Sequence, residues 1–240
     1  MLRIHALGTL GVALEPARGA PAPVGQPKLL ALLLYLALAR PHGFHQRDHL
    51  VGLLWPELSQ DQARAALRKA LHRLRSSCGD DIVATAGQDA VSVPLTARWC
   101  DVDAFEAAIA GGRFGEALDL YRGELAPGLY VAGAPRFEQW VSGERARLQD
   151  AAVGAAWHVV EQLTNAREFT DASRVARRVA RLANGDERVV RKVMRMLARL
   201  GDRAGAMRVY RQFERQIDEE LQLRPAAETV QLATEIAEQD

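Results

Sequence analysis

The chain has 240 residues, of which 48% are hydrophobic and 6% aromatic, and its formal net charge at pH 7 is +1. This length is enough for two domains of ordinary size, and the hydrophobic content excludes a largely disordered chain. The helix-favouring residues Ala, Leu, Arg and Glu dominate the composition, so we expect a mainly α protein.

The charge is unevenly distributed along the chain. Residues 1–98 contain 11 Lys and Arg against 7 Asp and Glu, whereas residues 99–240 contain 20 against 23. Residues 59–79 contain five basic residues and one acid, and they account for the whole positive excess of the first part. A local basic patch on a near-neutral protein is consistent with nucleic-acid binding.

The two cysteines, Cys78 and Cys100, have no CxxC spacing and form no disulfide framework, which favours a reducing compartment. The longest apolar run, residues 29–39, is too short to span a bilayer and too far from the N-terminus for a signal peptide. We therefore expect a cytoplasmic protein that is not attached to a membrane.

The beginning of the chain has the pattern of short strands. Leu2–Ala6 and Thr9–Leu14 are predicted strands, and the Gly-, Ala- and Pro-rich stretch Ala17–Gly25 is a predicted turn leading to a third, weaker strand. These segments together predict a small antiparallel sheet.

Two helices and a hairpin are predicted around the basic segment. Pro27 suits the first turn of a helix that is apolar nearly all round, so we expect a buried helix over residues 27–39. Arg47–Leu54 is a second predicted helix, which ends at Trp55 because a residue before proline disfavours the helical region. Residues 82–85 and 91–93 predict a hairpin with a turn between them.

The basic segment itself is predicted to be a helix with defined ends. Ser59 and Gln62 have the spacing of a capping box, and Gly79 suits a C-terminal cap. An advance of about 100° per residue gathers the apolar side chains on one face. That core-facing stripe consists of Ala63, Ala66, Leu67, Ala70, Leu71, Leu74 and Cys78.

The opposite face of this helix is small and basic. It is centred on Ala65, Arg68, His72 and Ser76, with Arg64 and Arg75 on one flank, Lys69 on the other, and Arg73 near the border with the core. Such a face suits a DNA major groove, because arginine bonds guanine and both arginine and lysine neutralise phosphates. A solvated surface helix with no ligand would show the same pattern, so the helix alone leaves both readings open.

From about residue 99 the pattern becomes helical to the end. Ala172 and Ala206 are 34 residues apart in similar segments, which is the tetratricopeptide period. Turns are predicted at Gly201-Asp202 and at residues 184–186, and residues 137–163 predict a long interior helix. A short solenoid of paired helices is expected.

These segments carry a family resemblance. The stretches LLALLLYLALARP, RDHLVGLLWP and ARAALRKALHRLR resemble the OmpR-type winged helix of streptomycete antibiotic regulatory proteins. DVDAFEAAIAGGRFGEALDLYRGELAPGL and VYRQFERQIDEELQLRPAAETVQL resemble the bacterial transcriptional activator domain of the same regulators. The resemblance implies an N-terminal winged helix-turn-helix domain (α+β) over residues 1–98 and an all-α, tetratricopeptide-like domain over residues 99–240.

The resemblance also implies a function and its residues. In that family the third helix enters the major groove of promoter DNA and the hairpin is the wing. We expect DNA contacts from six residues. Arg68, Lys69 and His72 are expected to read bases, and Arg64 and Arg75 to bind phosphates. The role of Arg73 is open between phosphate binding and structural pairing. One departure is that Thr85–Val93 contains no Lys, Arg or Tyr, which puts wing contacts to phosphate in doubt.

The same resemblance implies a transcription activator that recruits RNA polymerase, with the loop Trp55–Leu58 as the candidate contact, and a possible homodimer through the helical domain. An alternative is a protein-interaction module whose winged helix is degenerate. A ligand sensor that uses the concave face of the helical domain is a third hypothesis.

Other constellations are weaker. His42, His45 and His49 with Asp48 have spacings that a metal site could use, but no Cys or Glu completes the set. The phosphate-loop, zinc-hydrolase and esterase motifs are absent from the sequence. We expect no metal, no cofactor and no enzymatic activity.

Overall fold

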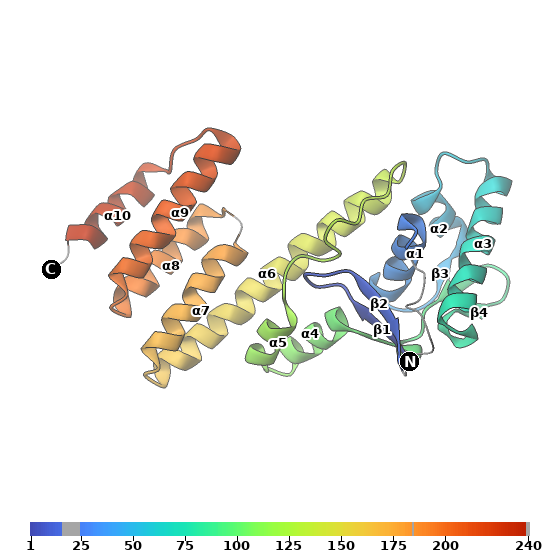
Figure 1. Cartoon of the computed structure of the whole chain (residues 1–240), viewed down its shortest axis with the longest axis horizontal. Coiled ribbons are helices and arrows are strands. Elements are labelled where there is room, and N and C mark those ends of the chain that lie inside the picture. The colour runs from blue at the N-terminus through green and yellow to red at the C-terminus, as the bar shows by residue number, and fades with distance from the viewer. Residues whose placement is uncertain (16–24, 184, 239–240) are drawn as a thin grey trace. The chain divides into compact units, whose positions relative to one another are not determined.

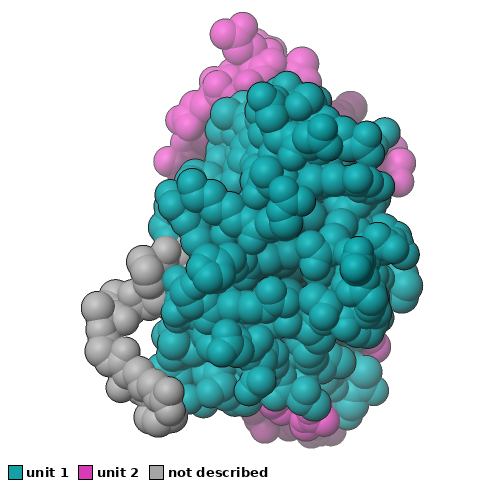
Figure 2. Space-filling view, turned by 90° about the vertical axis from the view of Figure 1, so that its right-hand side faces the viewer, with its two compact units in different colours: residues 1–111, 119–148 teal, residues 112–118, 149–240 magenta. Residues whose placement is uncertain are grey.

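The computed structural model describes residues 1–15, 25–183 and 185–238. The chain forms two compact units, which are coloured separately in Figure 2. Unit 1 comprises residues 1–111 and 119–148, and unit 2 comprises residues 112–118 and 149–240.

A sheet at the beginning of the chain belongs to unit 1. Its strands β1 (Leu2–His5), β2 (Gly11–Leu14) and β6 (Arg98–Cys100) have the order β2-β1-β6. The two predicted strands are confirmed, but the prediction of a purely antiparallel sheet is wrong, because β6 pairs with β1 in parallel. The predicted turn at residues 17–25 falls, except for its last residue, outside the described residues.

Three helices follow with bounds close to those predicted: α1 (Pro27–Leu38), α2 (Arg47–Leu54) and α3 (Gln60–Cys78). The predicted burial of α1 is confirmed, since nine of its twelve residues are buried. In Figure 1, α1 and α2 lie beside α3, and contacts join all three helices. This core holds α3 by its apolar stripe.

The predicted hairpin is confirmed and gains a third strand. β4 (Ala84–Ala86) and β5 (Ala90–Ser92) pair antiparallel, and β3 (His45–Gln46) pairs with the other side of β5. β4 is shorter than predicted because residues 80–82 form a 3₁₀ turn, η1 (Asp80–Ile82). A second 3₁₀ turn, η2 (Leu95–Ala97), precedes β6.

The strand β6 leads directly into α4 (Asp101–Ala110). The Asp101 side chain is buried and accepts hydrogen bonds from the backbone amides of Ala6 at 2.9 Å and Leu7 at 3.0 Å. Arg98 is also buried, and it donates to the carbonyl of Ala37 at the end of α1. These bonds connect the first sheet to α4, which begins with Asp101, and to α1, which contains Ala37.

The chain returns to β1 after α5 (Phe114–Leu120). Gly8, at φ +81°, donates to the carbonyl of Glu124 at 2.9 Å. The backbones approach so closely there that a Cβ on Gly8 would lie 2.7 Å from the carbonyl carbon of Arg122. This crossing positions the segment that follows, including residues 130–132, within unit 1.

Among the remaining helices, each runs antiparallel to the one before it in the chain (Figure 1). Contacts join α7 to α8, α8 to α9 and α9 to α10. These helices are α6 (Pro135–Asn165), α7 (Phe169–Leu182), α8 (Glu187–Arg199), α9 (Arg203–Leu221) and α10 (Ala227–Glu238). The long predicted helix lies within α6. Ala172 and Ala206 are fully buried, as close helix packing requires. The turn at Gly201-Asp202 is confirmed, whereas the predicted turn at residues 184–186 begins outside the described residues.

Candidate nucleic-acid interface

The helix α3 has the two faces that its sequence predicts. Gln62 accepts a hydrogen bond from the Ser59 amide at 3.3 Å, so the capping box forms, and Gly79 caps the other end at φ +103°. Of the predicted core stripe, all members are buried except Ala66, which is half-buried. The apolar face is thereby fixed against α1 and α2, and the basic face points away from that core.

Three side chains on the outer face are without a partner among the residues that the structure describes. Arg68, Lys69 and His72 are exposed, and within the described part of the chain their side chains make no hydrogen bond or ion pair. They extend over about one turn of helix, since they lie within five successive residues. These are the three residues expected to read bases.

Arg64 is held by a carboxylate. Its Nε and Nη2 donate to the two oxygens of Asp48 in α2, at 3.0 Å and 2.9 Å. Both side chains are largely exposed, at 46% for Arg64 and 63% for Asp48. An exposed pair is worth about 0–1 kcal/mol, so Arg64 can exchange this carboxylate for a phosphate at little cost.

Arg73 and Arg75 are also tethered, each to a different element. Arg73 donates to the side-chain oxygen of Gln26 at 2.5 Å, and Arg75 donates to the carbonyl of Val83, just before β4, at 3.3 Å. Arg75 is half-buried, whereas Arg73 is exposed. The structure thus gives Arg73 a structural partner, and it gives Arg75 a position between α3 and the hairpin.

A groove of about 700 Å³ runs between α3 and the hairpin β4–β5. Polar and charged side chains line most of it, and four arginines face two aspartates. The arginines are Arg47, Arg64, Arg68 and Arg75, and the aspartates are Asp48 and Asp89. The groove therefore has a net positive charge, which suits a polyanion.

Arg47 is the member of this groove that sequence reasoning missed. Its backbone amide donates to the carbonyl of Asp89 at 2.8 Å, which holds the start of α2 against the hairpin. Its Nε is buried without a hydrogen-bond partner among the described residues. The sequence offered little signal, because this position depends on β3, a strand of two residues.

The hairpin contributes backbone and acid to the groove, but no cation. Asp89 is the charged residue of the turn between β4 and β5, and Thr85, Gly87 and Gln88 line the groove beside it. Contacts from such a wing would come from amides and hydroxyls, which also bind phosphate.

Two of the histidines whose spacing a metal site could use, His45 and His49, contact Tyr35 instead. His49 shares a hydrogen bond of 2.8 Å with the hydroxyl of Tyr35, and the rings of Tyr35 and His45 pack edge to face. Burial lowers the pKa of His45, and His49 and His42 lower it further. Among the described residues, no group of three or more His, Cys, Asp or Glu side chains is placed to hold a metal ion.

The helices of the described residues include none that is long and apolar enough to cross a membrane.

The fold and this face define the class: a winged helix with its third helix exposed, followed by a helical domain, as in streptomycete antibiotic regulatory protein-like transcriptional regulators. The chain belongs to the bacterial transcriptional activator domain family, whose profile matches residues 100–237. No curated protein matches the chain in sequence.

A solved structure shares the fold. Mycobacterium tuberculosis EmbR, in complex with a low-affinity phosphopeptide, superposes with a TM-score of 0.64 at 21% sequence identity. The alignment covers 98% of this chain and 65% of the EmbR chain. This chain therefore spans about two thirds of the length of EmbR.

Proposed function

We propose that this protein is a sequence-specific DNA-binding transcription activator that inserts α3 into the major groove of promoter DNA. Its DNA-binding domain is residues 1–98, and its activator domain is residues 99–240. It acts without enzymatic activity or a cofactor, and it acts in the cytoplasm.

The observation that carries this proposal is the state of the basic side chains on α3. Arg68, Lys69 and His72 are exposed and unpaired within the described chain, whereas the neighbouring arginines are held by protein groups. Side chains left free on a rigid helix suit base recognition, because arginine and lysine bond the acceptors of guanine. Because the apolar face of α3 packs against α1 and α2, its outer face is open to enter the groove of DNA.

The tethered arginines have supporting roles. Arg64 and Arg75 flank the groove beside the hairpin and bind phosphates, and Arg64 releases Asp48 to do so. Arg73 remains bonded to Gln26 and supports the position of α3 against α1. Phosphate contacts of this kind set the register without reading sequence.

Activation requires a protein partner, and RNA polymerase is the one that the family implies. The loop Trp55–Leu58 presents Leu58 at 37% exposure and Glu57, which is bonded to Lys28. We assign polymerase contact to this loop. The helical domain provides the surface for a possible homodimer.

The test is selection of DNA from a fragmented genome of the source organism, followed by titration of the best fragment against salt. We expect selective binding, and Arg68→Ala should cost about 1–3 kcal/mol and relax sequence choice. The double variant Arg68→Ala, His72→Ala should lose selectivity. Arg64→Ala should weaken binding to all sequences alike and reduce the salt slope by about one.

The matched control is Arg195→Ala, which removes an exposed arginine from α8 in unit 2 and should leave DNA binding unchanged. If the α3 variants bind DNA as the unmodified protein does, α3 is not the recognition helix. Binding that is weak, insensitive to sequence and abolished by salt would favour the interaction module with a degenerate winged helix. The family match does not favour that alternative.

A further inference from the structure

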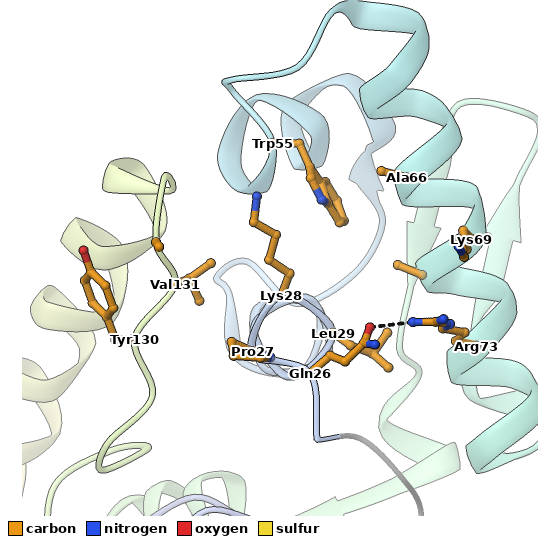
Figure 3. Close-up of a pocket in the computed structure, with 12 residues that line it drawn as sticks. Gln26, Pro27, Lys28, Leu29, Trp55, Ala66, Lys69, Arg73, Tyr130 and Val131 are labelled. Atoms are coloured by element: carbon orange, nitrogen blue, oxygen red, sulfur yellow. Dashed lines mark hydrogen bonds between the residues drawn. The ribbon is translucent and has the colours of Figure 1, made fainter.

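A second pocket in unit 1 is unlike the groove beside the hairpin. It has a volume of about 560 Å³ and lies between α1, α3, the end of α2 and the segment 130–132 (Figure 3). In Figure 3, α3 stands on one side and Tyr130 and Val131 on the other, with Trp55 and Lys28 between them. All of these elements belong to one compact unit.

The body of this pocket is apolar and has aromatic surfaces. Trp55 lines it although only 7% of that residue is exposed, and Leu29, Ala66 and Val131 add aliphatic surface. Tyr130, at 68% exposure, is an aromatic side chain left open to solvent at its edge. Pockets of about 300–1,000 Å³ with apolar walls are typical sites for small molecules.

The charged groups of the pocket are all cations. Among the residues that line it, all of them described, Lys28, Lys69 and Arg73 are basic and none is acidic. Lys28 bonds Glu57 outside the lining at 2.5 Å and stands 5.8 Å from the centre of the Trp55 ring, while Arg73 bonds Gln26. Lys69 alone has no partner for its ammonium group in the described chain.

We propose that this pocket binds a small amphipathic anion, with a planar apolar body against Trp55 and an anionic group on Lys69. The flat body matches the aromatic and aliphatic walls, and the anion pairs with Lys69, the cation of the pocket lining that has no partner among the described residues. A charge-assisted hydrogen bond from Lys69, with Arg73 nearby, fixes the orientation.

The position of the site couples it to DNA, and this part rests on the proposed function. Lys69 and Arg73 belong to α3, so an anion on Lys69 removes a cation from the face that enters the groove. The ligand and DNA then compete for the same side chain. By thermodynamic linkage, bound DNA lowers the affinity for the ligand by the same factor as bound ligand lowers the affinity for DNA.

The test uses two probes with the same aromatic body. 8-Anilinonaphthalene-1-sulfonate carries a sulfonate, N-phenyl-1-naphthylamine is neutral, and both report binding to the native full-length protein by their fluorescence. We expect one saturable site for the anionic probe. Lys69→Gln should weaken that probe about tenfold, as loss of one charge-assisted bond implies, and leave the neutral probe within about twofold.

The control is Arg68→Gln, which removes a free cation from the next position of α3 but does not line this pocket. It should change neither probe. A filling variant, Ala66→Phe, should weaken both probes, with its circular dichroism compared with that of the unmodified protein. If both probes bind equally, or if Arg68→Gln weakens the anionic probe as much as Lys69→Gln does, the proposal is overturned. Absence of a saturable site would also overturn it and leave the pocket as a surface for a protein partner.

A second titration separates this proposal from the proposed function. Saturation with the anionic probe should weaken binding to the selected DNA fragment, and the effect should vanish in Lys69→Gln. Probe binding without any selective DNA binding would leave the pocket established and contradict the proposed function. Selective DNA binding without probe binding would support the proposed function and contradict the proposal for the pocket.

Discussion

At the scale of single residues, the pair Asp48–Arg64 lowers the positive charge of the face that we propose for DNA binding. Asp48 accepts hydrogen bonds from Nε and Nη2, one edge of the Arg64 guanidinium, while remaining exposed itself. This carboxylate lies in the groove into which a phosphate would have to come, so it opposes DNA by its charge. In the proposed interface, Asp48 would therefore disfavour binding that does not depend on sequence.

The substitution Asp48→Asn tests this directly. We expect tighter binding to all DNA sequences with an unchanged salt slope, because Arg64 binds a phosphate in both proteins but no longer has to leave a carboxylate first. Stability should change by less than about 1 kcal/mol, as for other exposed pairs. DNA titrations at several salt concentrations would measure the slope, with Asp61→Asn as the control, since it removes an exposed acid from the first turn of α3. Equal gains in the two variants would assign the effect to net charge alone.

His45 makes stability depend on pH. Its pKa is lowered by burial and by His49 and His42, from a usual value of 6.5. The unfolded chain therefore binds a proton more tightly than the folded chain, so this contribution to stability is complete above pH 6.5 and is lost as the pH falls below it. We expect a smaller free energy of unfolding at pH 5 than at pH 7, measured by urea titration. In His45→Gln the difference between the two pH values should be smaller, and an unchanged difference would assign the effect to other groups.

The outer face of α3 could be predicted residue by residue because helical periodicity separates it from the core. The state of each side chain could not be predicted in the same way. Arg64, Arg73 and Arg75 have partners 16, 47 and 8 residues away in the chain, and these partners come into range only when the helices and the hairpin pack. Which cations remain free for a ligand is therefore a property of the tertiary structure.

At the scale of secondary-structure elements, the sequence predicts those with local signals. α2 has its predicted bounds because its end is imposed by Trp55-Pro56, and α3 has them because both caps are visible in the sequence. The strands β3 and β6 carry no such signal. Each is two or three residues long and exists only through pairing with a strand more than 40 residues away. β-propensity cannot identify such strands, since it depends on neighbours.

At the scale of the whole molecule, the winged helix is tied to the chain beyond residue 98. The predicted domain boundary falls within β6, whose pairing with β1 involves Trp99 and Cys100. Asp101, just beyond, receives the backbone amides of Ala6 and Leu7 in a buried position. A chain that ends at residue 98 loses these partners, and each amide left unsatisfied costs about 1–3 kcal/mol.

We therefore expect the fragment 1–98 to unfold at a lower temperature than the fragment 1–148, which retains β6 and Asp101. Thermal unfolding followed by circular dichroism would measure both midpoints. The control is Asp101→Ala in the longer fragment, which should lower its midpoint part of the way toward that of the shorter one. Equal midpoints for the two fragments would show that residues 1–98 are sufficient for their own stability.

The same junction contains a cysteine whose reactivity reports on the opening of the sheet. Cys100 lies in β6 with 1% of its surface exposed, and burial, followed by the charge of Asp101, raises the pKa of its thiol to about 12. Thiol reagents react with the thiolate and not with the protonated thiol. The sulfur of Cys100 is therefore unreactive while β6 is paired with β1. The rate at which Cys100 is labelled in the native protein consequently measures how often β6 separates from β1.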